Sequence, residues 1–301
     1  MSQPRALSTP AATHRQEAWL SRRSGRRALA RAVVYLCLVG GAVLILIPLL
    51  WMISLSFMTL EQALRFPPEW IPNPFVPIWQ NMARTLETQP FGLYAINTSR
   101  IVAFSLVGQV LSSALVAFGF ARLRAPGANV LFMVLISTIM LPYIVTMIPQ
   151  FVLFTTLGWV NTPLPLIVPS FSGGAFYIFL LRQFFMTIPI EMDDAARIDG
   201  AGTLTIFWRI IVPLSKPALA AVAIFSFYSY WNDFLGPLIY LQHDSQRTLS
   251  LGLALLRDPR AIPELNTIMA WTFVVALPCI LVFFFAQRYF IQGIVISGVK
   301  G

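Results

Sequence analysis

The sequence predicts an all-α integral membrane protein with six transmembrane helices, and two observations support this prediction. Charged residues make up only 11% of the 301 residues, against roughly 25% in a soluble domain, and the mean hydropathy is +0.73. Apolar stretches of the length that crosses a bilayer, about 20 residues, also recur along the chain between polar segments. The six predicted spans are residues 30–57, 98–121, 129–150, 164–186, 217–241 and 268–292.

Prolines fall inside the third and fourth predicted spans, at Pro142, Pro149, Pro165 and Pro169, and predict that both spans are broken. A proline within a span is tolerated where neighbouring helices satisfy the carbonyl group that it frees. These residues therefore favour a bundle of packed helices over isolated membrane anchors.

The N-terminal segment, residues 1–29, is polar and carries two arginine pairs, at 22–23 and 26–27, directly before the first span. Because that span is about twice as long as the apolar region of a signal peptide, we expect an uncleaved first helix. If the N-terminus lies inside, the inner segments hold 15 of the 21 lysines and arginines, and only Arg65, Arg84, Arg100, Arg247, Arg257 and Arg260 lie outside. This bias predicts a cytoplasmic basic segment at residues 1–29 and a six-helix domain at residues 30–301, with both termini in the cytoplasm.

Composition also limits the classes of function. The net charge is +9, but the cations cluster at the ends of apolar segments, which indicates membrane topology and not nucleic-acid binding. Cys37 and Cys279 lie in apolar spans, and neither His14 nor His243 has a partner at ligand spacing, so we expect no metal site. The chain contains no HExxH or GxSxG motif and no GxxxxGK[ST] phosphate loop. We therefore expect no catalytic residue and no cofactor bound by this chain.

One polar loop, of about residues 189–216, separates the fourth and fifth spans, and the positive-inside bias places it in the cytoplasm. A short helix is predicted over residues 191–199, with acids in its first turn, where they suit the positive end of the helix dipole. Gly200 suits a left-handed C-cap or a sharp bend, and a second helix over residues 203–211 is predicted to end before Val212 and Pro213. Local chemistry leaves two interpretations open, a solvated connector or an element that docks on another protein.

The spacing in this loop resembles the coupling-loop signature of ABC importer permeases. An acid and two alanines, Asp194-Ala195-Ala196, are followed after three residues by Gly200, and after nine more by Ile210-Ile211-Val212-Pro213. The resemblance implies that the loop docks in a groove of a cytoplasmic ATPase, with Asp194, Ala195, Ala196 and Gly200 at its core. The family usually has Glu at the position of Asp194, which leaves neighbouring acids as candidates to share its role. The full set of expected ATPase-coupling residues is Glu191, Asp193, Asp194, Ala195, Ala196, Asp199, Gly200 and Pro213.

Further segments resemble the carbohydrate branch of these permeases, that of the maltose, multiple-sugar and glycerol-3-phosphate systems. They occur in the family's order, as Trp79-Gln80-Asn81, residues 157–162, Arg182-Gln183-Phe184-Phe185, Trp231-Asn232-Asp233-Phe234 and Gly298-Val299-Lys300-Gly301. The implied fold is a type I ABC importer permease bundle with a cytoplasmic coupling helix.

Polar and aromatic residues in the fifth span form a candidate substrate path. An ionisable residue within a span is a functional candidate by default, and aromatic faces, amides and carboxylates also suit sugars. The competing interpretation is hydrogen bonding between helices together with an aromatic anchor at the membrane interface. The residues of the candidate path are Tyr228, Tyr230, Trp231, Asn232 and Asp233.

The family resemblance also implies the partners. They are a second permease subunit, expected to form a heterodimer, two cytoplasmic ABC ATPase subunits that bind ATP and Mg²⁺, and an extracytoplasmic solute-binding protein. The expected function is translocation of a sugar or related solute by alternating access across a bacterial or archaeal cytoplasmic membrane. The alternative is a secondary transporter driven by an ion gradient, but the two internally similar halves that such a protein often shows are not found between residues 30–150 and 164–292.

Overall fold

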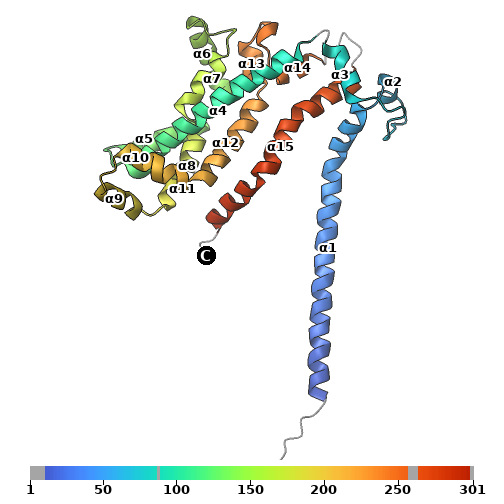
Figure 1. The fold of residues 1–301 in the computed structure, drawn as a ribbon, viewed down its shortest axis with the longest axis horizontal. Coiled ribbons are helices and arrows are strands. Elements are labelled where there is room, and N and C mark those ends of the chain that lie inside the picture. Colours follow the sequence, from blue (N-terminus) through green and yellow to red (C-terminus); the bar gives the residue numbers. More distant parts are fainter. Residues whose placement is uncertain (1–10, 87–88, 257–263, 299–301) are drawn as a thin grey trace, which may run out of the picture.

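The computed structural model describes residues 11–86, 89–256 and 264–298, and within these ranges the chain is helical and contains no β-strand. The prediction of an all-α fold is therefore confirmed. The helices, drawn in Figure 1, are α1 (Ala11–Ser56), α2 (Leu60–Ala63), α3 (Ile78–Leu86), α4 (Phe91–Arg122), α5 (Ala128–Ser137), η1 (Thr138–Met140), α6 (Tyr143–Thr156), α7 (Leu164–Ile167), η2 (Val168–Ser172), α8 (Ala175–Thr187), α9 (Glu191–Ile198), α10 (Thr203–Ile206), η3 (Phe207–Ile211), α11 (Val212–Leu214), α12 (Lys216–Trp231), α13 (Leu235–Tyr240), η4 (Asp244–Gln246), α14 (Leu249–Leu255) and α15 (Leu265–Gly298).

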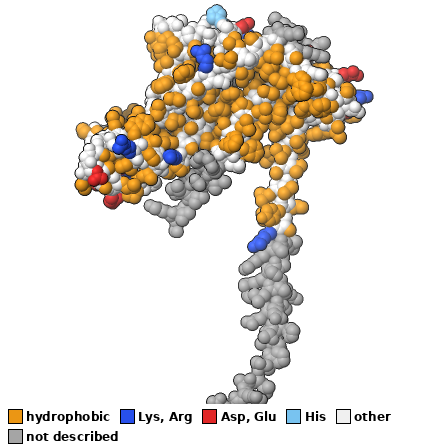
Figure 2. All heavy atoms as spheres, in the orientation of Figure 1, with side chains coloured by type: hydrophobic (Ala, Val, Ile, Leu, Met, Phe, Trp, Pro, Cys, Tyr) orange, Lys and Arg blue, Asp and Glu red, His pale blue; other side chains and the backbone are white. Residues whose placement is uncertain are grey.

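In the part of the chain that the structure describes, four helical segments are long and apolar enough to cross a membrane, namely Ala30–Ser56, Phe91–Arg122, Leu164–Thr187 and Leu265–Gln287. Two bent pairs pass the same test, Ala128–Met140 with Tyr143–Thr156 at 99° and Thr203–Leu214 with Lys216–Trp231 at 80°. The count reaches the predicted six if each bent pair is one span. Figure 2 shows the matching surface, in which hydrophobic side chains cover the flank of the body and charged ones gather at its ends.

The structure corrects three details of the predicted spans. The third segment bends between Met140 and Tyr143, as Pro142 predicts, but Pro149 lies inside α6 and does not break it. The helix continues because a single proline removes only one backbone donor, and a freed carbonyl can find other partners. The fifth segment ends at Trp231 and not at residue 241, since α13 is a separate helix. In the fourth segment the prolines begin short helical turns, and the chain turns at Gly173, whose φ is +77°.

The helix α4 is the central element of the fold, and each of its ends belongs to a different apolar cluster. Near Phe91 and Tyr94 the cluster includes Trp231 and Trp271, with Phe91 stacked on Trp271 at a centroid distance of 4.0 Å. Near its other end, Phe118 is buried with residues of α8, α10, η3 and α12. Thus one helix of 32 residues, about 48 Å long at 1.5 Å per residue, connects the two halves of the core.

A close contact between α4 and η2 depends on Gly108. A Cβ atom at this position would lie 2.6 Å from a ring carbon of Phe171 and 2.7 Å from the hydroxyl of Ser170. Glycine therefore allows the backbone of α4 to approach η2, as small residues do where membrane helices meet.

The Phe91 end of the body is held together by buried amides. Asn81 of α3 donates hydrogen bonds to the carbonyls of Ser56 and Met58, each at 2.9 Å. Asn266 of α15 donates to the side-chain oxygen of Asn81 at 3.0 Å and to Met58 at 3.2 Å. The segment Trp79-Gln80-Asn81 thus connects the end of α1 to α15.

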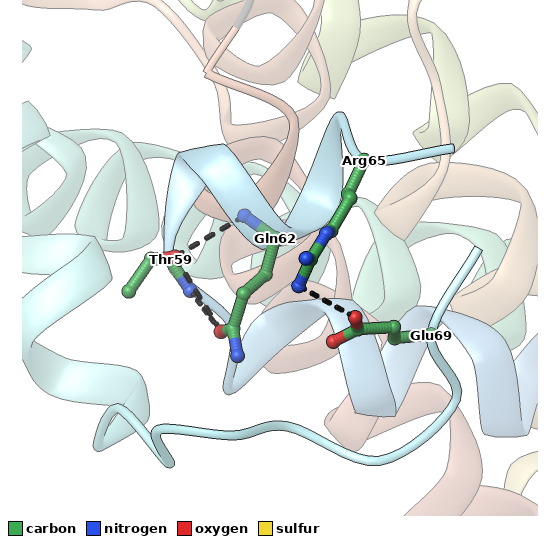
Figure 3. Close-up of polar contacts among 4 residues, drawn as sticks. All are labelled: Thr59, Gln62, Arg65 and Glu69. Carbon is green, nitrogen blue, oxygen red and sulfur yellow. Dashed lines mark hydrogen bonds and ion pairs between the residues drawn. The ribbon is translucent and has the colours of Figure 1, made fainter. Parts of the chain in front are cut away.

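The short helix α2, next to this cluster, begins with a capping box (Figure 3). The hydroxyl of Thr59 accepts the backbone N–H of Gln62, and the side chain of Gln62 accepts the backbone N–H of Thr59. Arg65 and Glu69 form an exposed ion pair at 2.8 Å just beyond it. These contacts close the turn that follows α1.

The helix α1 stands apart from the other helices over most of its length (Figure 1), and none of its apolar window is buried within the chain. The predicted boundary at residue 29 falls inside this helix, which already begins at Ala11. Residues 1–10 of the basic N-terminal segment lie outside the described residues.

Candidate functional site

The polar loop forms a short amphipathic helix, α9, at the Arg122 end of α4. Glu191, Asp193 and Asp194 occupy its first turn and Arg197 its last, in the arrangement that suits the helix dipole. Asp194 and Arg197 form an exposed ion pair at 3.1 Å. The side chains of Glu191 and Asp199 are exposed as well, so most of the acids of this loop face away from the protein.

Gly200 ends α9 in a left-handed conformation with a φ of +82°, which confirms the sharp bend predicted at this residue. Its N–H donates to the carbonyl of Arg197 at 3.0 Å, and the N–H of Ala201 donates to Ala196 at 2.8 Å. This pair of hydrogen bonds is the Schellman motif, which satisfies carbonyls that a helix end otherwise leaves unpaired. The loop is therefore an ordered turn between two helical segments.

Large apolar side chains point outward on the same loop. Ile198 is 87% exposed and Leu204 is 66% exposed, and Trp208 and Met192 are also exposed. Ala195 is exposed beside them and presents only a methyl group. Exposed apolar side chains therefore gather on the same loop as its exposed acids.

The second half of the loop differs from the prediction, because its helix does not end before Val212. The chain continues from α10 through a π-helical turn, η3, into α11, which contains Pro213. A proline disrupts an α-helix by clashing with the carbonyl four residues earlier. We attribute its accommodation here to the wider π-helical turn that directly precedes it.

Asp193 faces the opposite way from the other acids of α9, and its side chain is fully buried. Its carboxylate lies 3.5 Å from Nε of Arg122, the last residue of α4, whose side chain is only 4% exposed. Arg122 also donates a hydrogen bond to the carbonyl of Ile188 at 2.8 Å. Of the predicted coupling residues, Asp193 is thus directed into this chain and not toward solvent.

The residues of the candidate substrate path divide between two faces of α12. Tyr228 donates to the carbonyl of Cys279 at 2.6 Å, and Trp231 donates to the carbonyl of Val275 at 3.0 Å. Asn232 donates to the carbonyl of Tyr228. Tyr228 and Trp231 therefore donate hydrogen bonds to backbone carbonyls of α15 on either side of its Pro278.

Tyr230, on the other face of α12, and Asp233, just beyond the end of this helix, line a cavity of about 410 Å³. The hydroxyl of Tyr230 donates to the side-chain oxygen of Gln109 at 2.9 Å, and Gln109 donates to Ser113. Asp233 accepts the N–H of Gly236 at 3.2 Å, at the start of α13. One carboxylate and one tyrosine of the predicted path therefore line this cavity, while the other three residues of that path do not.

Sequence reasoning missed several polar residues that complete this cavity. They are Thr98 of α4, Tyr143 and Gln150 of α6, Ser229 of α12, Tyr240 of α13, and Thr248. The bend at Pro142 brings Tyr143 to the cavity, and the separate α13 brings Tyr240. The sequence signal that could have identified Tyr143 is its position directly after Pro142, the proline that breaks the span.

These features define a class: a multi-pass helical membrane protein with a cavity at one end of its longest buried helix and an exposed polar loop at the other. The family model described as "Binding-protein-dependent transport system inner membrane component" matches residues 109–296. The chain belongs to this family, the membrane component of ABC importers.

Curated relatives agree over most of the chain. It is 33% identical over 271 residues to the sn-glycerol-3-phosphate transport system permease protein UgpE of Yersinia pestis, covering 87% of this chain and 95% of that one. It is 37% identical over 213 residues to the arabinooligosaccharides transport system permease protein AraQ of Halalkalibacterium halodurans, covering 70% and 76%. It is 32% identical over 268 residues to the lactose transport system permease protein LacG of Rhizobium radiobacter, covering 89% and 96%.

A solved structure shows the same fold. A chain of a bacterial ABC transporter involved in the import of the acidic polysaccharide alginate superposes with a TM-score of 0.74 at 21% identity, covering 95% of this chain and all of that one. The expected bundle of an importer permease is therefore confirmed at the level of the fold.

Proposed function

We propose that this chain is the permease subunit of an ATP-driven importer and that α9 and its surroundings dock on a cytoplasmic ATPase. The observation that carries this proposal is the exposure of Ile198 and Leu204, at 87% and 66%, on the charged loop. The ordered turn at Gly200 supports it, because it holds these side chains on a defined surface. The exposed carboxylate of Asp194 adds a group for a basic residue of the ATPase, although Arg197 already pairs with it.

The proposal includes the membrane arrangement and the partners. Both termini and α9 lie in the cytoplasm, as the distribution of basic residues favours. A second permease subunit completes the translocation path, two ATPase subunits bind ATP and Mg²⁺, and a solute-binding protein delivers the solute from outside. This chain binds no cofactor of its own. Closure of the ATPases on ATP moves α9 and opens the path outward, and hydrolysis resets it.

The cavity of about 410 Å³ is the proposed solute site of this subunit. Tyr143, Tyr230 and Tyr240 offer ring faces and hydroxyls, and Gln150 and Asp233 offer hydrogen-bonding groups to a polyhydroxy solute. Among the residues that the structure describes, the cavity lining includes a carboxylate but neither lysine nor arginine, which favours a neutral sugar over a phosphorylated solute. In uptake assays on cells, lactose and an arabino-oligosaccharide are the neutral probes and sn-glycerol 3-phosphate is the anionic one. Uptake of the anionic probe alone would contradict this assignment.

Co-purification from detergent-solubilised membranes tests the docking proposal. Ile198→Asp places a charge on the proposed contact surface and is expected to release the ATPase. The matched control is Ile71→Asp, the same change at a residue that is 79% exposed in the segment between α2 and α3, and it is expected to retain the ATPase. Retention of the ATPase by both variants would refute docking at α9.

A further inference from the structure

The buried contact between Asp193 and Arg122 joins the proposed docking helix to the longest buried helix of the protein. Asp193 is the one acid of the first turn of α9 whose side chain has no exposure, while the acids on either side of it in that turn are exposed. A buried carboxylate is strongly unfavourable unless an opposite charge lies beside it. The only oppositely charged group that the described residues place within ion-pair distance of it is the guanidinium of Arg122, at 3.5 Å.

Arg122 makes two contacts, one on each side of the start of α9. Its Nη2 donates to the carbonyl of Ile188, before the helix, and its Nε faces Asp193, within the first turn. Arg182 of α8 lies nearby and donates to the carbonyl of Phe120, but its guanidinium lies over the ring of Phe132, 4.2 Å from the centroid. One side chain of α4 therefore fixes both the position and the orientation of α9.

The far end of α4 borders the cavity. Thr98 and Ile101 line it directly, and the side-chain oxygen of Gln109 accepts a hydrogen bond from the hydroxyl of Tyr230 on α12. Because α4 is continuous from Phe91 to Arg122, a displacement of its last turn is carried along its axis to these residues. Rigid elements that connect two sites in this way can carry energetic coupling between them.

We propose that the Arg122–Asp193 ion pair is the positioning contact that transmits movement of α9 to α4 and so to the cavity. This inference rests on the proposed docking of α9 and assigns Asp193 a role inside this chain, distinct from contact with the ATPase. Removing one charge leaves the other buried without its partner, which loosens α9 on α4 while leaving the exposed face of α9 unchanged.

The test measures whether nucleotide changes the accessibility of the cavity, and it requires no knowledge of the solute. In a Cys37→Ala/Cys279→Ala background, Ser229→Cys introduces a single thiol on the cavity wall. The assembled complex, purified through this chain, is labelled with a water-soluble maleimide with and without AMP-PNP and Mg²⁺. We expect nucleotide to change the labelling rate about tenfold, within the usual range of coupling between sites.

Asp193→Asn is expected to retain the ATPase, while the ratio of labelling rates with and without nucleotide falls toward one. Its thermal stability is expected to fall, because the guanidinium of Arg122 stays buried without its partner. If this variant does not assemble, the same labelling experiment is done on the double variant Arg122→Met/Asp193→Leu, called the apolar pair. A buried ion pair can often be replaced by apolar residues without loss of stability. The apolar pair is expected to assemble and to have lost the labelling response. A full response in an assembled variant of either kind overturns the inference, as does a loss of response in the apolar pair that parallels a loss of its stability.

The Ile198→Asp variant separates the two proposals. If it releases the ATPase and Asp193→Asn still responds fully, docking at α9 stands and the role of the ion pair is refuted. If it retains the ATPase and the parent complex still responds to nucleotide, the proposed docking surface is wrong.

Discussion

Replacing Gly200 with asparagine, alanine or proline is expected to destabilise the turn at the end of α9 by increasing amounts. Gly200 has a φ of +82°, and an added Cβ would meet no atom within 4 Å. The cost of alanine is therefore purely conformational, and the left-handed region costs an L-residue about 1–2 kcal/mol. Asparagine visits this region more readily and should cost less.

Proline should have a much larger effect than either, because its φ is fixed near −65°. It also removes the N–H that donates to the carbonyl of Arg197. We expect this substitution to unwind the end of α9 and to abolish ATP-driven uptake while the protein remains in the membrane.

The assay is the affinity of the purified permease for its ATPase in detergent. If docking requires the ordered turn, a conformational cost of about 1–2 kcal/mol weakens binding about 5- to 30-fold for Gly200→Ala. Gly200→Asn should lie between Gly200→Ala and the parent protein. Equal affinity of the parent and Gly200→Ala would refute the reasoning, and so would an asparagine variant as defective as the proline variant.

Three further predictions concern stability, measured by thermal unfolding of the purified protein. Asn81→Leu should destabilise by about 1–3 kcal/mol for each buried group that loses its partner, and an unchanged midpoint would contradict the role of this amide. Gly108→Ala should destabilise by about 1–3 kcal/mol through overpacking, whereas Gly119→Ala, which meets no atom within 4 Å, should be neutral or stabilising. Tyr230→Phe should cost about 1 kcal/mol, and a double-mutant cycle with Gln109→Leu should show a coupling energy of similar size; additive losses would exclude the contact.

The helical fold and the bend at Gly200 could be predicted from local sequence, because their signals are local. Span length and charge depletion identify the helices, and the positive φ of Gly200 follows from the glycine that ends a short polar helix. The inward direction of Asp193 could not be predicted in this way. Helical periodicity gives the relative angle between Asp193 and Asp194, but the side of α9 that packs on the protein depends on Arg122, 71 residues earlier in the chain.

The different directions of the aromatic side chains of α12 could not be predicted for the same reason, because they depend on a distant part of the chain. Tyr228 and Trp231 are one helical turn apart and both face α15, whereas Tyr230 points across the bundle to Gln109. Composition marked all of these residues as functional candidates. Only the position of α15 distinguishes the residues that donate hydrogen bonds to its carbonyls from the residues that border the cavity.

The contact between Arg122 and Asp193 also constrains how often the chain passes through the bilayer. It holds the end of α4 and the start of α9 at one level, so residues 123–190 leave one face of the membrane and return to it. That requires an even number of passages, and the candidate span Leu164–Thr187 accounts for one of them. We therefore predict that the bent pair of α5 and α6 is the other, as a broken span and not as a re-entrant hairpin. On this prediction its 99° bend lies at membrane depth, where irregular backbone must be buried in protein or border water, and Tyr143 beside the bend lines the cavity.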